Sequence, residues 1–324
     1  MYILVAIFSY LLNAGVYISD KFLLSKKVHS SIVYAFYVGI WSLGNFVLLF
    51  FDPWVPDWWQ LAFDVAAGLL FLFTLVFWYK ALHQSEATRV VPIVGALTPI
   101  FSFLLSMIFL ETKLFAQEII AFILLIAGGV LISVKRTRVY LLGETRERIK
   151  NISGNVFGKY HAGLRPTSRL LLNSVISAAC FAAYFVFIKY IYSHTHQPFI
   201  GAFVWSRLGS FIGVLIILAV PAWRQMIRSS EQKQKRTKKQ LAFFLGVRFA
   251  AAIAFILLNW AISLGNVSMI NALQGTQYVF LLFIVILLAR KYPRFINEEI
   301  GRGVILQKTI GVILVGIGLY LLVA

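Results

Sequence analysis

The sequence predicts an all-α polytopic membrane protein with ten transmembrane helices arranged as two five-helix inverted repeats. Hydrophobic residues make up 60% of the 324-residue chain and charged residues only 13%. That leaves too little polar surface to coat a soluble domain of this length. Ten segments are apolar over the roughly 20 residues that a bilayer-crossing helix needs. The last five of these segments resemble the first five, and this pattern predicts the repeat.

The ten predicted spans follow one another along the chain. Irregular backbone cannot face lipid, so helices must carry nearly all of the chain inside the bilayer. The start of the chain has no positively charged stretch, so we expect an uncleaved first helix rather than a signal peptide. In chain order the predicted spans are residues 2–19, 32–51, 61–82, 90–110, 117–134, 170–192, 199–220, 241–264, 267–288 and 304–323.

The fourth span and its echo, the ninth, are the centre of this pattern. The fourth span contains Pro92, Gly95 and Pro99, and we expect the two prolines to kink it, because each removes a helix hydrogen bond. Aligning the apolar segments that precede the two spans places Gly275 on Gly95. With five spans in each half, the second half enters the membrane from the opposite side, and inverted repeats of this kind are typical of secondary transporters.

The distribution of charge predicts the topology. The net charge is +18, and Lys and Arg are concentrated in the links after odd-numbered spans. Short basic links stay on the cytoplasmic side of a membrane, so we expect these links there. Both termini are then expected outside the cell membrane. The predicted repeats cover 1–134 and 170–324, and a basic cytoplasmic linker at 135–169 joins them. Because topology accounts for the charge, we expect no nucleic-acid partner.

The sequence offers little for enzyme chemistry. Cys180 is the one cysteine, so neither a disulfide within the chain nor a cysteine metal site is possible. His194 and His196 supply two metal ligands without a third. We find no glycine loop that would cradle phosphates and no nucleophile–base pair. We therefore expect no enzyme activity, cofactor or metal.

Two arginines lie inside predicted spans. An Arg at a helix centre costs about 2.5–3.5 kcal/mol on insertion scales, so such residues persist where they face a cavity or a partner. Arg207 and Arg248 are candidates for binding an anionic group such as a carboxylate. The alternative is structural: either Arg pairs with Asp64 or with carbonyl groups, or extends to the interface.

The ninth span carries a second set of polar groups. Asn271, Gln274 and Tyr278 fall at i, i+3 and i+7 and share one helix face, which favours a cavity wall. Interhelical hydrogen bonding is the alternative. Asp64 is a candidate for carrying a coupling proton. Weaker lining candidates are Asn13, Tyr17, Tyr79, Tyr184, Asn259 and Trp260.

The fifth and tenth spans are rich in glycine, and small residues let helices approach closely. We interpret these two spans as scaffold helices or as contacts of a homodimer.

Several short motifs agree with a known pattern. Lys21 and Lys189 close the first span of each half, and Gln117 and Gln307 open the last. Other matching features are Tyr79-Lys80-Ala81, Pro99, Leu110-Glu111, Gly128-Gly129-Val130 and Gly311. With these features the chain resembles the drug/metabolite transporter superfamily of EamA type over nearly its whole length. The chain departs from that family in two places: an Arg early in the second span occurs only in the second half, as Arg207, and no second-half Glu matches Glu111.

The resemblance implies transport of small metabolites, commonly amino acids. We expect a secondary transporter that moves small polar or amphipathic solutes bearing a carboxylate across the cell membrane by alternating access, with efflux as the expected direction. A carrier of lipids or lipid-linked substrates is the first alternative. An intramembrane enzyme is the second, and it would need catalytic groups that the spans lack.

Overall fold

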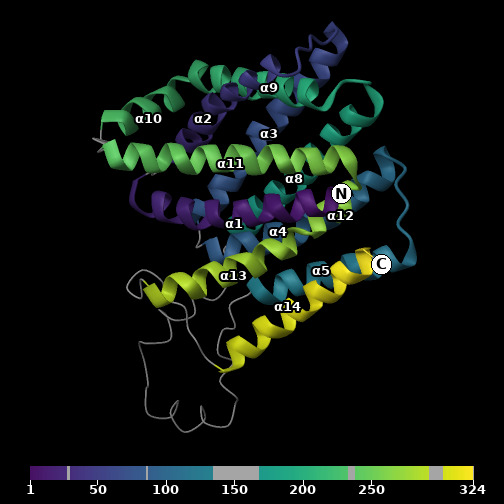
Figure 1. Ribbon diagram of the computed structural model, residues 1–324. Helices are drawn as coiled ribbons and strands as arrows, with labels where there is room; N and C mark the ends of the chain where they lie inside the picture. Colours follow the sequence, from purple (N-terminus) through teal and green to yellow (C-terminus); the bar gives the residue numbers. More distant parts are fainter. Residues whose placement is uncertain (28–29, 85–86, 134–167, 233–237, 292–301, 324) are drawn as a thin grey trace, which may run out of the picture.

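The computed structural model describes residues 1–27, 30–84, 87–133, 168–232, 238–291 and 302–323. Within these ranges the chain is built from helices, with no strand (Figure 1). The predicted linker at 135–169 lies almost wholly outside them. The helices are α1 (Tyr2–Lys27), α2 (Ser31–Trp41), η1 (Ser42–Phe50), α3 (Trp58–Gln84), α4 (Ala87–Phe109), α5 (Ala116–Ser133), α8 (Ser168–His194), α9 (Phe199–Ala219), α10 (Pro221–Gln232), α11 (Lys238–Leu264), α12 (Val267–Ala272), α13 (Gln274–Lys291) and α14 (Arg302–Val323).

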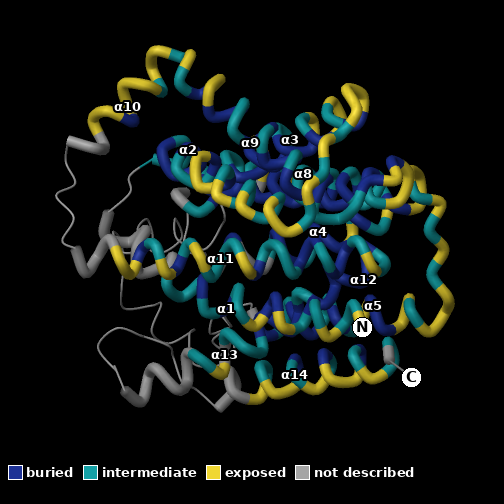
Figure 2. The backbone as a smooth tube through the Cα atoms, turned by 45° about the horizontal axis from the view of Figure 1, so that its top comes forward, coloured by how far each residue is buried: buried dark blue, intermediate teal, exposed yellow. Residues whose placement is uncertain are grey.

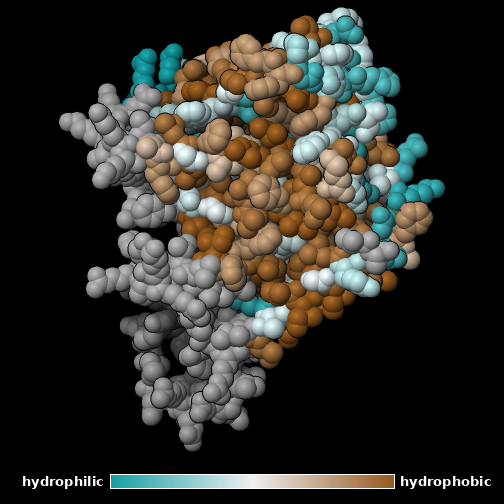
Figure 3. Space-filling model, viewed as in Figure 1, coloured by the Kyte–Doolittle hydropathy of each residue, from teal (hydrophilic) through white to brown (hydrophobic). Residues whose placement is uncertain are grey.

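The outer surface is that of a membrane protein. Six stretches within the described helices are long and apolar enough to cross a bilayer, and three further apolar helices are shorter. Large hydrophobic side chains such as Phe73, Phe249 and Ile108 project from the surface. Figure 3 shows hydrophobic residues covering most of one face, with hydrophilic residues gathered toward one end. A continuous apolar surface of this kind is stable only in lipid or against another apolar surface.

Successive long helices run back and forth between two ends of the bundle, and both termini lie at the same end (Figure 1). The most buried segments belong to α3, α8 and α9, with α4 beside them (Figure 2). α3 packs against both α8 and α9, while α1 packs against α11 and α13. Helices from the two predicted halves are therefore interleaved rather than side by side.

Two predicted spans are interrupted. The second span is an α-helix, α2, that tightens into the 3-10 helix η1, where Ser42 Oγ donates to the Gly39 carbonyl (2.6 Å). Such side-chain bonds to the preceding turn compete with regular helix. The ninth span is split at Leu273 into α12 and α13. The short helix α10, which follows α9, was not anticipated from the sequence.

The two prolines of the fourth span lie within one continuous helix, α4. Neither Pro92 nor Pro99 ends it.

Close backbone contacts lock α3 to α9. A Cβ at Gly68 would collide with the Ser206 carbonyl, and a Cβ at Gly209 would collide with the Val65 carbonyl. Ser210 Oγ donates to the Gly68 carbonyl at 3.0 Å. In a membrane, contacts between small residues replace the hydrophobic drive for helix association. The α3–α9 pair is thus a rigid unit.

A second glycine contact joins α5 and α14. A Cβ at Gly128 would lie 2.7 Å from the Gly311 carbonyl oxygen, and a Cβ at Gly311 would lie 2.9 Å from that of Gly128. The glycine-rich spans therefore form a contact within the chain, as the scaffold interpretation holds.

This contact predicts opposite effects for two Gly→Ala changes. Gly128→Ala should lower stability by about 1–3 kcal/mol, because the methyl group meets the backbone of α14. Gly316→Ala, on the exposed side of α14 with open space around it, should raise stability by about 0.5–1 kcal/mol. Thermal unfolding in detergent measures both. Equal shifts in the two variants would contradict the close approach.

Candidate functional site

Arg207 is the most deeply buried basic side chain among the described residues, with 1% of its surface exposed. It lies in the ninth position of the 21-residue helix α9, about 12 Å along the axis at 1.5 Å per residue. Nη2 donates to the Tyr184 hydroxyl (2.8 Å) and to Ser206 Oγ (3.0 Å), and Nε donates to Ser206 Oγ (3.3 Å). Nη1 makes no hydrogen bond within the described part of the chain.

Aromatic rings enclose the guanidinium. Its carbon lies 4.7 Å from the ring centroid of Phe71, 4.9 Å from that of Phe203 and 5.2 Å from that of Phe255. A desolvated cation over an aromatic face gains about 2 kcal/mol or more. In the described residues no carboxylate lies within ion-pairing distance of Arg207. The positive charge is held by ring faces and neutral oxygens alone.

Tyr184 connects this arginine to a third helix. Its hydroxyl donates to Asn259 Oδ1 on α11 (3.2 Å), while Asn259 Nδ2 donates to the Phe255 carbonyl (2.9 Å). Both side chains are fully buried. Arg207, Tyr184 and Asn259, predicted separately as candidates, therefore form one hydrogen-bonded chain across α9, α8 and α11, which we call the Arg207 chain.

The second predicted arginine is elsewhere. Arg248, on α11, is partly exposed, and its guanidinium carbon lies 5.3 Å from the Tyr34 ring and 5.5 Å from the Phe244 ring. Tyr34 stacks edge-on against Tyr79 (4.5 Å). The structure does not join Arg248 directly to Arg207.

The predicted face of the ninth span turns toward α4. Asn271 Nδ2 donates to Ser102 Oγ (2.7 Å), so this amide makes an interhelical hydrogen bond, the alternative role considered above. Tyr278 is 5% exposed, and its hydroxyl occupies the space beside Gly95. Gln274 is only partly buried at the start of α13. The break at Leu273 separates Asn271 from the other two.

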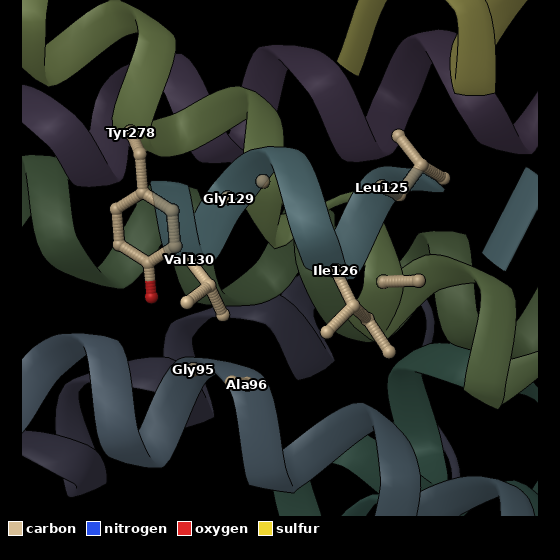
Figure 4. Close-up of a pocket in the computed structure, with 9 residues that line it drawn as sticks. Gly95, Ala96, Leu125, Ile126, Gly129, Val130 and Tyr278 are labelled. Carbon is tan, nitrogen blue, oxygen red and sulfur yellow. The ribbon is translucent and has the colours of Figure 1, made fainter. Parts of the chain in front are cut away.

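Figure 4 shows the small pocket next to Tyr278, whose ring descends from α13 toward Gly95 on α4. Its lining residues, Gly95, Gly129 and Gly275 among them, enclose no space large enough for a water molecule, and the roughly 180 Å³ of empty space there includes volume open to the surroundings. Metabolite sites usually have about 300–1,000 Å³. The pocket is therefore a gap between helices that rings and glycines nearly fill.

A tyrosine group lies around α1. Tyr17 is within electrostatic range of the hydroxyls of Tyr10, Tyr79 and Tyr278, and its ring meets Trp78 edge-on at 6.0 Å. Asn13 donates only within its own helix, to Ser9 (3.4 Å), and Trp260 is partly buried on α11. Tyr17, Tyr79 and Tyr278 are therefore brought together, whereas no side-chain hydrogen bond or ring contact in the described residues joins Asn13 or Trp260 to either group.

Asp64 is fully buried on α3, where Gln197 donates to its Oδ1 at 3.5 Å. It forms no ion pair with Arg207, so one of the three structural roles considered for that arginine is absent from this conformation.

Sequence reasoning missed the partners that shape the site. Phe71, Phe203 and Phe255 are three of 29 phenylalanines in the chain, and nothing in their spacing separates them from core residues. Ser206, which accepts two hydrogen bonds from Arg207, could have been noticed as the neighbour of a charged residue inside a span.

Comparisons with known proteins identify the fold only. No family model and no curated protein matches the chain. Solved structures do match. One, described only as "Crystal structure of protein", has a TM-score of 0.64 and 14% identity, and the match covers 99% of this chain and 94% of that one. It shows a shared fold and nothing more.

The Arg207 chain makes the Tyr184 hydroxyl important for stability. Tyr184→Phe should lower stability by about 1–3 kcal/mol, because Arg207 Nη2 and Asn259 Oδ1 each lose a buried partner. Tyr320→Phe, whose ring is 71% exposed, should change it by less than about 0.5 kcal/mol. Thermal unfolding of both purified variants is the measurement, and matching melting temperatures would refute the role of the hydroxyl.

Proposed function

We propose that the chain is a secondary transporter of the cell membrane that moves a small solute with an anionic group by alternating access. The observation that carries the proposal is the buried guanidinium of Arg207, which has no anionic partner in the part of the chain that the structure describes. Two N–H groups on Nη1 remain available, and a planar fork suits a carboxylate. A buried cation with unused donors at membrane depth is typical of a substrate or ion site.

We further propose ten spans in two inverted repeats, with α2 and η1 as one span and α12 and α13 as another. Helix contacts support a two-fold relation between the halves. α1, first in one half, packs against α11 and α13, and α8, first in the other, packs against α3 and α4. α11 and α13 are the equivalents of α3 and α4, so the first helix of each half packs against equivalent helices of the other half.

Hydrogen bonds between α5 and α14 support the same relation residue by residue. Gln117 Nε2 donates to the Leu321 carbonyl and Gln307 Nε2 to the Leu131 carbonyl, both at 2.7 Å. Gln307 and Leu321 lie 190 positions after Gln117 and Leu131. The donor of one bond is therefore equivalent to the donor of the other, and the acceptors are equivalent in the same way. An approximate two-fold axis between the antiparallel helices α5 and α14 would relate the two bonds like this. These glutamines also belong to the EamA-type motifs, and they support the proposal of that family.

In the proposed mechanism two groups of helices, each containing helices from both halves, rock around the Arg207 chain. In this mechanism the close packing around Arg207 corresponds to an occluded conformation. Opening toward either side would separate the aromatic rings and expose Nη1. The rigid α3–α9 pair would move as one body, while the break at Leu273 allows α12 and α13 to change their relative angle.

Binding of anionic solutes tests the proposal. Amino acids and dicarboxylates, with neutral sugars for comparison, are tested for thermal stabilisation of the purified protein. At a hundredfold excess over Kd, a true ligand should stabilise by about 2.7 kcal/mol. The effect should be lost in Arg207→Ala and weakened in Arg207→Lys, which keeps the charge without the fork.

Arg224→Ala on α10 is the matched control, because Arg224 is exposed and its loss removes the same charge. It should bind as the parent does. If Arg207→Ala also binds as the parent does, Arg207 is structural and the site moves to the Asn271 face. Stabilisation by lipids alone would favour the carrier of lipid-linked substrates.

A further inference from the structure

A second buried polar group lies outside the Arg207 chain, at the end of the bundle formed by the turns 51–57 and 195–198. Asp64 has no exposed surface and Gln197 is 6% exposed. Their one shared hydrogen bond is long, 3.5 Å from Gln197 Nε2 to Asp64 Oδ1. Asp64 Oδ2, Gln197 Oε1 and the Tyr192 hydroxyl are all buried without a hydrogen-bond partner.

Local structure shields this group from water. Gln60, one turn before Asp64, donates to the Thr195 carbonyl (2.9 Å) and accepts from the Asp57 amide (2.9 Å). The next residue, His196, has φ 55°, a left-handed conformation that is uncommon without glycine. This turn directs Gln197 back toward Asp64.

The charges around Asp64 are few. α8 contributes Tyr192 and α9 contributes Arg207, and Tyr192 lies within electrostatic range of both Asp64 and Arg207. On α2, Tyr34 contacts Tyr79 near the far end of α3, and Tyr37 packs on Phe36. The one ionisable residue of α4 is Arg89, in its first turn. No cation pairs with the carboxylate in the described residues.

An ionised carboxylate in this place would be buried, unpaired and poorly hydrogen-bonded, which proteins avoid by neutralising the group. A proton on Oδ2 changes the count of donors. A protonated carboxyl has one O–H donor, and of the unsatisfied oxygens nearby, Gln197 Oε1 is an acceptor and the Tyr192 hydroxyl can accept or donate. One proton would satisfy two of the three groups that lack partners.

We propose that Asp64 binds one proton in the occluded state and releases it to water when this end opens, and that the proton and the anionic solute bind cooperatively. The second part rests on the proposed function. An ionised Asp64 would compete with a solute anion for the field of Arg207, because Tyr192 interacts with both side chains. Proton binding removes that competition, and by reciprocity the solute favours the proton. Transport would then be proton–solute symport.

Protons alone test the first part. The infrared spectrum of the purified protein should contain a protonated-carboxyl band that disappears as the pH is raised. The band should be lost in Asp64→Asn and kept in Asp57→Asn, the exposed control. Tyr192→Phe should shift the band without abolishing it, because the carboxyl loses one acceptor. Absence of the band from the parent, its survival in a folded Asp64→Asn protein, or its removal by Na⁺ at constant pH would overturn the proposal.

Solutes test the second part. The panel of amino acids and dicarboxylates is titrated at pH 6 and pH 8. Any ligand that depends on Arg207 should bind about tenfold more tightly at pH 6, and equally at both in Asp64→Asn. Equal affinity in the parent would overturn cooperativity. If no solute binds at either pH, the proposed function fails, while the infrared band still decides the proton site.

Discussion

The charge of Arg207 must be accommodated inside a bundle whose outer surface is apolar, and the surrounding structure follows from that requirement. No carboxylate pairs with the guanidinium in the described residues. Its stabilisation comes from Ser206, Tyr184 and the faces of phenylalanine rings. Each contribution is small compared with the cost of removing an ion from water. Only their sum, in one geometry, makes burial tolerable, so four helices must be held in register.

Close contacts at glycines hold these helices in register. Gly68 and Gly209 bring the backbones of α3 and α9 into contact and so fix Phe71 beside Arg207. On the other side of the molecule, Gly128 and Gly311 do the same for α5 and α14. The Tyr278 ring fills the space left by Gly95, where any larger residue would collide with it. Dense packing at these positions explains why the occluded structure has no metabolite-sized cavity next to Tyr278.

The sequence predicted the apolar helices and the importance of Arg207, because a charged residue inside an apolar span is conspicuous. It also predicted that Gly128 and Gly311 lie on helices that pack closely. The break at Leu273 was not predicted, since neither proline nor glycine occupies that position. The role of Gln197 was also missed, because it depends on a left-handed turn at His196, a residue type with no strong preference for that conformation. The hydrogen bond between Tyr184 and Asn259 depends on tertiary packing, because the two residues lie 75 positions apart in the chain.

Alternating access requires that the Arg207 chain face water in turn on the two sides of the membrane. A cysteine in place of Phe255, one wall of the aromatic cage, in a chain whose native Cys180 is replaced by Ala, reports this directly. Impermeant thiol reagents are applied from either side of oriented vesicles. We expect the cysteine at position 255 to be labelled from both sides, and any solute that binds Arg207 should slow the labelling. Labelling from one side only, or from neither, would contradict alternating access at this site.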